Sequence, residues 1–233
     1  MADFVLVHGA WHGAWCWKRI VPPLWSKGHR AFAVTLSGVG ERAHIPPETV
    51  TLATHIQDVA GVIEAEELSN VILVGHSYGG MVITGVAQRL ADRLGRLVYL
   101  DAVVPRAGES WSSSHTEETR LARRAAIAAN GGALPAPDPA IFGLTGADAA
   151  WVARRQTPQP GAVYDAPLTF DPARVSALPR TFISCTAPAL ATIDASRARA
   201  RTESGWDFVE LATGHDPMIS MPGALLQELL RLA

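Results

Sequence analysis

The stretch Val71-Ile72-Leu73-Val74-Gly75-His76-Ser77-Tyr78-Gly79 joins an apolar run to a Gly-x-Ser-x-Gly pattern, and a helix-forming segment follows it. The apolar run predicts a strand that is buried on both faces. A strand that turns sharply into a helix holds the serine between them in a strained, exposed position, and glycines flank it because side chains would collide in the turn. The serine hydroxyl then lies at a helix N-terminus, which favours negative charge. A chance glycine-rich turn is the alternative, but the strand before and the helix after favour a nucleophile elbow built on Ser77.

Short apolar runs recur along the chain, and helix-like segments lie between most of them. The predicted strands are 4–7, 31–35, 71–75, 97–101, 181–185 and 208–211. The predicted helices of the same region are 17–27, 54–66, 80–94, 193–202 and 223–232. This alternation predicts an α/β fold with a mostly parallel sheet and helices on both of its faces.

Residues 105–178 differ from the rest of the chain. They contain eight prolines, short helical stretches at 116–129 and 147–156, and the aromatic residues Trp111, Phe142, Trp151 and Tyr164. A long insertion of this kind after a sheet strand predicts a cap over a pocket, because ligands of open α/β sheets bind outside the carboxyl ends of the strands. A surface excursion anchored by its aromatics is the alternative. We therefore expect a core of residues 1–104 and 179–233 with a cap inserted at 105–178.

Composition excludes several classes of function. The chain has 233 residues, of which 48% are hydrophobic and 18% charged, so it fits one folded domain. A net charge of -2 and the lack of a basic stripe argue against nucleic acid as a partner. No apolar run is long enough for a membrane span and no signal segment is visible, which favours a cytoplasmic location. Cys16 and Cys185 lie far apart and suggest neither a disulfide nor a metal site.

A serine nucleophile needs a base, because its hydroxyl is a weak nucleophile at its ordinary pKa. In enzymes with this type of elbow, the chain order is serine, then acid, then histidine. The base is therefore expected in the loop after the last strand, where Gly214-His215-Asp216 stands. We predict His215 as the base, whereas His76 lies inside the elbow and is expected to pack or form a hydrogen bond.

An oxyanion hole requires two backbone N–H groups directed at the developing charge. The residue after the nucleophile, Tyr78, supplies the first. The loop after the first strand, His8-Gly9-Ala10, supplies the second through Ala10, and Gly9 lets that loop approach the substrate closely. His12 is expected to brace this loop by hydrogen bonds.

The acid of the triad has two candidates. The usual loop after the penultimate strand, 186–190, contains no carboxylate, and Asp194 comes next but is expected to lie within the following helix. Asp101 ends an apolar strand on the same sheet edge as Ser77, where a lone charge is costly unless it is paired. We predict Asp101 as the acid, with Asp194 as the second candidate and a purely structural Asp101 as the remaining reading.

The chain resembles the plant hydroxynitrile lyase and methylesterase family of α/β-hydrolases, and still more its bacterial esterase-like relatives. The resemblance runs nearly end to end and rests on VHGAWHGAW (7–15), VGHSYGGM (74–81) and GHD (214–216). It implies Ser77 and His215 as triad members and Ala10 and Tyr78 as oxyanion donors. It also implies a small apolar pocket for compact or aromatic esters, without a metal or cofactor.

Two departures from the family bear on activity, and a third concerns the acid. The lyases carry a threonine where this chain has Ala10, and a lysine directly after the catalytic histidine, where this chain has Asp216, which would repel a departing cyanide. The plant enzymes carry the acid after the penultimate strand, whereas Asp101 resembles the acid position of haloalkane dehalogenases. We therefore expect a serine carboxylester hydrolase acting on small aryl or short-chain esters. Cyanohydrin cleavage and a hydrolase-fold ligand-binding protein with little turnover are the alternatives.

The partner expected from these features is a small-molecule ester, bound with the help of three tryptophans. They are Trp11, which follows the oxyanion loop, and Trp111 and Trp151 in the predicted cap. A large aromatic side chain offers a broad apolar surface to such a ligand. A homodimer is compatible with the sequence, and neither nucleic acid nor a membrane is expected as a partner.

Overall fold

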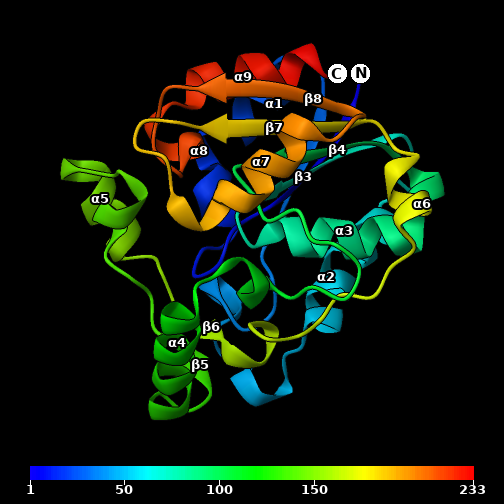
Figure 1. Cartoon of the computed structure of the whole chain (residues 1–233). Helices are drawn as coiled ribbons and strands as arrows, with labels where there is room; N and C mark the ends of the chain where they lie inside the picture. Colours follow the sequence, from blue (N-terminus) through cyan, green and yellow to red (C-terminus); the bar gives the residue numbers. More distant parts are fainter.

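The computed structural model describes all 233 residues, and a six-stranded parallel sheet forms its centre (Figure 1). The strand order across the sheet is β2-β1-β3-β4-β7-β8. The strands are β1 (Asp3–Val7), β2 (Arg30–Val34), β3 (Val71–His76), β4 (Leu94–Leu100), β7 (Arg180–Cys185) and β8 (Trp206–Leu211). Every residue of β1 and β3 is buried, as expected for apolar strands covered on both faces.

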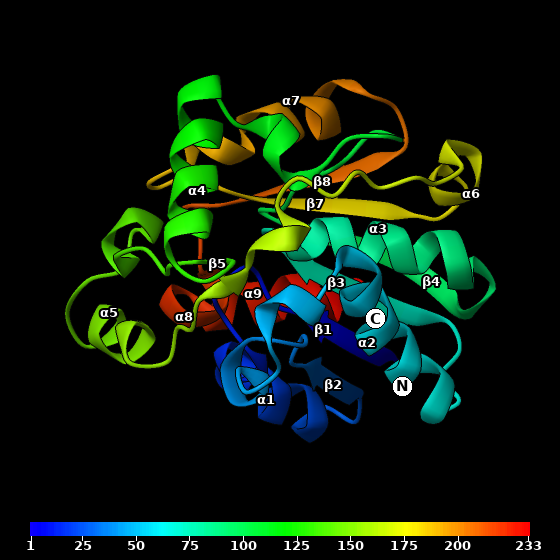
Figure 2. The same cartoon turned by 90° about the horizontal axis from the view of Figure 1, so that it is seen from below.

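Helices cover both faces of the sheet, as the alternating pattern predicts (Figures 1 and 2). One face carries α1 (Val21–Ser26) and α9 (Pro222–Arg231), which pack against each other. The opposite face carries α2 (Leu52–Ala65), α3 (Gly79–Leu90) and α7 (Asp194–Thr202). No helix combines the length and the apolar character needed to cross a bilayer.

The chain between β4 and β7 adds no strand to the central sheet. It forms α4 (Glu117–Ala129), α5 (Gly146–Ala153), α6 (Pro172–Ser176) and a small antiparallel pair, β5 (Ala133–Leu134) with β6 (Gln159–Pro160). In Figure 1 the arrowheads of β7 and β8 point to the side of the molecule on which α4 and α5 lie. The part of this excursion that holds α4 and α5 therefore extends beyond the carboxyl ends of the strands, where ligands of such sheets bind, whereas α6 lies at the opposite end of the strands and packs against α3.

Three predicted elements differ from the observed ones. The predicted helix 17–27 is divided into a 3-10 helix, η1 (Ala14–Arg19), and α1, whose first turn holds Pro22 and Pro23. Proline has no N–H to continue the preceding turn, so a new helix starts there. The predicted helix 80–94 ends at Leu90, and β4 begins already at Leu94 and ends before Asp101.

Candidate active site

Ser77 lies between β3 and α3 in the left-handed region of backbone space, with φ of +53°. Such a conformation costs a non-glycine residue on the order of 1–3 kcal/mol, so surrounding bonds must hold it. The Ser77 N–H donates to the Leu100 carbonyl at 3.2 Å, and the Ser77 carbonyl accepts from Gly80 at 3.1 Å and from Val103 at 3.0 Å. The end of β4 thus fixes the strained turn that presents the half-buried serine.

Gly9 lets the loop after β1 lie directly against this turn. A Cβ atom at Gly9 would come within 2.8 Å of both the Ser77 Cβ and the His76 Nδ1. Real Cβ atoms essentially never approach that closely, so only glycine permits this contact. The absence of a side chain at position 9 therefore determines how near the next peptide, Gly9–Ala10, lies to the serine.

His215 and Asp101 form a buried pair. The His215 Nδ1 lies 2.7 Å from the Asp101 Oδ2, and the two residues are 2% and 0% exposed. The other carboxylate oxygen, Oδ1, accepts from the Cys185 N–H and from Arg197, each at 3.1 Å. Burial acts to raise the pKa of Asp101, but the His215 and Cys185 hydrogen bonds and the Arg197 charge lower it on balance. Asp101 is therefore an anion that holds the histidine ring.

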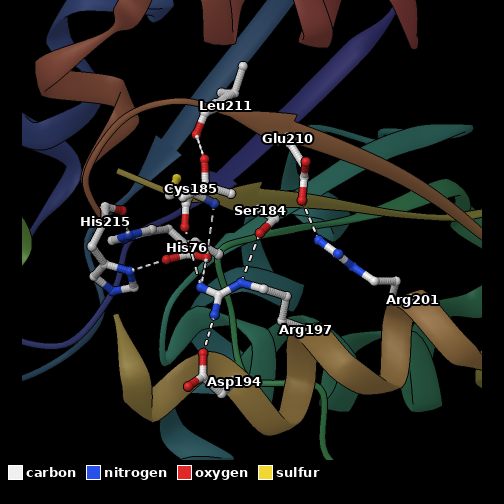
Figure 3. Close-up of polar contacts among 11 residues, drawn as sticks. His76, Ser184, Cys185, Asp194, Arg197, Arg201, Glu210, Leu211 and His215 are labelled. Carbon is white, nitrogen blue, oxygen red and sulfur yellow. Dashed lines mark hydrogen bonds and ion pairs between the residues drawn. The ribbon is translucent and has the colours of Figure 1, made fainter. Parts of the chain in front are cut away.

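Asp194, the second candidate for the acid, lies elsewhere. Its side chain is 66% exposed and pairs with Arg197, one turn along α7. Figure 3 shows Arg197 between Asp194 and Ser184, whose hydroxyl accepts from the Arg197 Nε at 2.9 Å. The structure thus brings Asp101, and not Asp194, to His215.

The N–H groups of Ala10 and Tyr78 donate to no acceptor within the protein. The peptide that carries the Ala10 N–H is held by His8, whose Nδ1 lies 2.7 Å from the Gly9 carbonyl oxygen. The other ring nitrogen of His8 accepts from the Leu36 N–H at 3.1 Å, so Nδ1 carries the proton. Burial lowers the pKa of His8 to about 3, which keeps the ring neutral. In a trans peptide the N–H points away from the carbonyl, so His8 directs the Ala10 N–H away from itself.

The sequence did not assign this role to His8. The only available signal was a histidine directly before a glycine at the end of the first strand, which also fits an ordinary turn. What identifies the role is the Leu36 N–H, which follows β2 and is remote in sequence.

A second buried carboxylate, that of Asp216, lies beside the histidines that support the loop carrying Ala10. The His12 Nδ1 lies 2.8 Å from the Ala10 carbonyl oxygen, and its Nε2 lies 3.3 Å from the Asp216 carboxylate, close enough for an ion pair but not aligned as a hydrogen bond. His76, in turn, contacts the His215 carbonyl oxygen at 2.8 Å and Asp216 at 3.5 Å. Burial would raise the pKa of Asp216, but His12 brings it down to about 2. Burial would likewise lower the pKa of His12, but Asp216 raises it.

Ser77 and His215 line one small cavity of about 90 Å³. Trp11 and Trp111 line it as well, with ring centroids 5.8 Å apart in an edge-to-face arrangement. Two hydrogen bonds of 3.1 Å join Trp11 to the segment between β4 and β7. Its backbone N–H donates to the Gln159 side chain, and its indole N–H donates to the Leu134 carbonyl. The residues of β5 and β6 thereby fix the ring that follows the Ala10 peptide.

Trp151, the third tryptophan predicted to contact substrate, does not line this cavity. It lies on α5 and packs edge-on against Trp15, with ring centroids 5.2 Å apart. Arg19 and Arg155 lie over its ring. The structure therefore does not bring Trp151 to this cavity, because aromatic content indicated the region that packs on the core but not which ring lines the cavity; its contact with substrate stays a prediction from the sequence.

The largest cleft of the molecule, about 500 Å³, lies elsewhere. Tyr99, Phe170 and Trp206 are among its lining residues, and none of Ser77, His215 or Asp101 is. No group of three or more His, Cys, Asp or Glu side chains is arranged to hold a metal ion. The small cavity, which Ser77 and His215 both line, is the candidate active site.

The strand order, the strained serine after β3 and the buried His–Asp pair define the α/β-hydrolase class of folds. The family model described as the alpha/beta hydrolase family matches residues 4–228. Along its whole length, the chain is 42% identical to the carbendazim hydrolyzing esterase of Nocardioides sp. (strain SG-4G), which is itself covered completely. The chain belongs to the alpha/beta hydrolase family.

Two further similarities agree with this assignment. Methylesterase 10 of Arabidopsis thaliana is 34% identical over 103 residues, which are 44% of this chain and 38% of that protein. A solved extracellular alpha/beta-hydrolase from a Paenibacillus species superposes with a TM-score of 0.83, covering 99% of this chain and 98% of that one at 22% identity. The resemblance to the plant methylesterase family and its bacterial relatives is confirmed, and so is the fold class.

Proposed function

We propose that Ser77, His215 and Asp101 form the catalytic triad of this chain, which is a carboxylesterase-type hydrolase. The observation that carries the proposal is the buried 2.7 Å contact between His215 and Asp101 at a cavity that Ser77 also lines. Asp101 accepts from Nδ1, so that Nε2 is the free acceptor on the ring. This is the tautomer that a general base for serine requires.

The reaction proceeds through an acyl-enzyme. The Ser77 oxygen attacks the ester carbonyl carbon while His215 takes the hydroxyl proton, and the carbonyl oxygen becomes an oxyanion. The N–H groups of Ala10 and Tyr78 donate to that oxyanion. When the C–O bond to the alcohol breaks, His215 gives its proton to the departing oxygen. Water then attacks the acyl-enzyme with His215 as base, and the carboxylic acid leaves.

Compact esters are the proposed substrates, with short acyl chains or an aryl group. A cavity of about 90 Å³ lined by tryptophans suits such groups better than long chains. We propose residues 105–178 as the cap, because this segment contributes Trp111, His115, Arg123, Ile141 and Phe142 to the lining of the cavity that Ser77 also lines. The anionic Asp216 beside His215 disfavours release of cyanide, so cyanohydrin cleavage is not proposed. A cytoplasmic location and a homodimer stay predictions from the sequence.

Hydrolysis of a p-nitrophenyl ester series, from acetate to decanoate, tests this function. We expect turnover that falls with chain length and disappears in Ser77→Ala, while the thermal unfolding of that variant stays near the wild type. A fluorophosphonate probe should label the wild type once and the variant not at all. Turnover that persists in Ser77→Ala would refute the serine mechanism, and a folded wild type that neither turns over esters nor reacts with the probe would favour the ligand-binding alternative.

A further inference from the structure

Helix α4 carries three arginines within five residues, and one of them, Arg123, forms no ion pair. Arg120 pairs with Glu117, and Arg124 makes two contacts of 2.9 and 3.1 Å to the Asp165 carboxylate. Arg123 takes part in none of the ion pairs of the molecule. Its side chain faces the cavity that holds Ser77.

The Arg123 guanidinium lies among aromatic rings. Its central carbon is 5.7 Å from the Trp11 ring, 5.2 Å from the Trp111 ring and 5.6 Å from the Tyr164 ring. These distances place it over the faces of the rings, which attract a cation. Its Nη1 donates a hydrogen bond to the Nε2 of His115 at 3.3 Å. Burial lowers the pKa of Arg123, and the Tyr164 hydroxyl, a second and weaker partner, acts to raise it.

His115 cannot balance the charge of Arg123. Burial, and then the Arg123 cation, lower the pKa of His115 to about 3, so the ring is neutral at ordinary pH. Its Nδ1 lies 2.9 Å from the Tyr164 hydroxyl, which leaves Nε2 to accept from Arg123. Arg123 thus remains a cation whose five N–H donors have only neutral partners, the His115 ring and the Tyr164 hydroxyl.

No acidic residue lines this cavity, and Arg123 is its one permanently charged lining residue. Asp101 lies behind His215, where it already pairs with Arg197. A half-buried cation that lacks a counter-ion is costly, whereas a carboxylate entering the cavity would accept two parallel hydrogen bonds from the guanidinium. The charge of the cavity therefore favours an anion.

We propose that Arg123 is a substrate-binding residue that selects esters carrying a free carboxylate, so that the natural substrate is a monoanionic ester. The proposal rests on the function proposed above and adds the chemical class of the substrate. Trp11, Trp111 and Tyr164 hold the guanidinium in place in the absence of the anion. The cleaved bond and the acyl-enzyme steps are unchanged, and the carboxylate takes no part in them.

Matched substrates test the proposal. On the alcohol side, 3- and 4-acetoxybenzoate are compared with the neutral 3- and 4-acetoxybenzamide, which share the acyl group and the shape. On the acyl side, mono(4-nitrophenyl) adipate is compared with the 4-nitrophenyl ester of adipamic acid. The readout is the ratio of kcat/KM for the anion to that for the amide, in the wild type, Arg123→Gln, Arg123→Lys and Arg124→Gln.

We expect the wild type to favour the anion in at least one pair, and Arg123→Gln to lower that ratio by about 10- to 100-fold, as loss of a charged hydrogen bond does. Arg123→Lys should retain part of the preference. Arg124→Gln removes the same charge from the same helix outside the cavity, so its ratio should match the wild type. A wild type without preference in any pair, or an equal change in Arg123→Gln and Arg124→Gln, would overturn the proposal.

A binding measurement separates this proposal from the proposed function. Calorimetry with Ser77→Ala compares 4-hydroxybenzoate and adipate with the amides 4-hydroxybenzamide and adipamide, with Arg123→Gln added to the same background. Tighter binding of a carboxylate that depends on Arg123 supports the anion site even if no ester is hydrolysed. Equal binding of acid and amide, together with ester turnover by the wild type, would leave the esterase standing and refute the role of Arg123.

Discussion

Replacing Asp101 by asparagine should nearly abolish turnover, because the surroundings of this side chain dictate how an amide would orient. One carboxylate oxygen faces two donors, the Cys185 N–H and Arg197, and the other faces the His215 Nδ1. In the Asp101→Asn variant, the amide oxygen would take the place next to the two donors. The NH₂ group of the amide would then face His215 and donate to Nδ1, which forces the ring proton onto Nε2.

A histidine protonated at Nε2 cannot accept the Ser77 proton, so the base is lost although the geometry is kept. The same change in a serine protease triad slows turnover by about 10⁴-fold, which at about 1.36 kcal/mol per factor of ten corresponds to about 5.4 kcal/mol of transition-state stabilisation. We expect a loss of that order in kcat/KM for p-nitrophenyl acetate. The wrong tautomer affects chemistry more than binding, so kcat should carry most of it.

Asp194→Asn is the matched control, because Asp194 also contacts Arg197 but is exposed and remote from His215. Its kcat/KM should stay within a few-fold of the wild type. Circular dichroism and thermal unfolding establish that both variants are folded. An Asp101→Asn enzyme with near-normal turnover would refute the reasoning, and a large loss in Asp194→Asn instead would move the acid to α7.

Three further outcomes follow from the oxyanion loop and its histidines. His8→Leu removes the donor that orients the Gly9–Ala10 peptide, so kcat should fall by about 10- to 100-fold. This is less than the roughly 10²–10³-fold that loss of an oxyanion-hole donor itself costs. An unchanged kcat in stopped-flow assays would argue against this role of His8. Gly9→Ala places a methyl group 2.8 Å from the Ser77 Cβ, so fluorophosphonate labelling should slow strongly, whereas unaltered labelling would mean that the loop can retreat. His8, His76 and His115 have folded pKa values of about 3, below the unfolded value of 6.5, so the unfolded state binds more protons between these limits. The free energy of unfolding in urea should therefore fall on acidification below about pH 6.5, with a slope that approaches about 4 kcal/mol per pH unit, and a flat profile from about pH 6.5 to 5 would show that these rings are not buried in neutral form.

Periodicity and apolar runs were sufficient to predict the sheet and most of its helices. All six predicted strands occur, since runs such as 71–75 have no polar residue to mark them as anything but doubly buried. The boundaries failed where local chemistry competed with periodicity. Pro22 and Pro23 began a new helix, and the chain from Ala91 to Leu94 left the helical pattern to enter β4.

The placement of the proposed site residues was predictable where the chain order itself carries information. Ser77 follows from its strand–turn–helix setting, and His215 and Asp101 from their places at strand ends, which the parallel sheet brings to one edge. The roles that we infer for His8 and propose for Arg123 were not predictable. Each depends on a partner remote in sequence, the Leu36 N–H in one case and the Trp11 and Trp111 rings in the other. Trp151 is the opposite case, because nothing in the sequence tells that α5 packs against Trp15 and contributes no residue to the cavity.

The acid at the end of β4 has a consequence for how this enzyme can change. Ser77 and Asp101 come from adjoining strands, so the connection from β7 to α7 carries none of the three proposed catalytic side chains. That connection nevertheless supplies Leu190, Thr192 and Ile193 to the cavity wall. This part of the cavity wall is thereby encoded in a segment separate from the proposed catalytic side chains. A mutant library restricted to these three positions would sample new substrates while leaving the reaction machinery intact, which makes this connection the natural starting point for directed evolution.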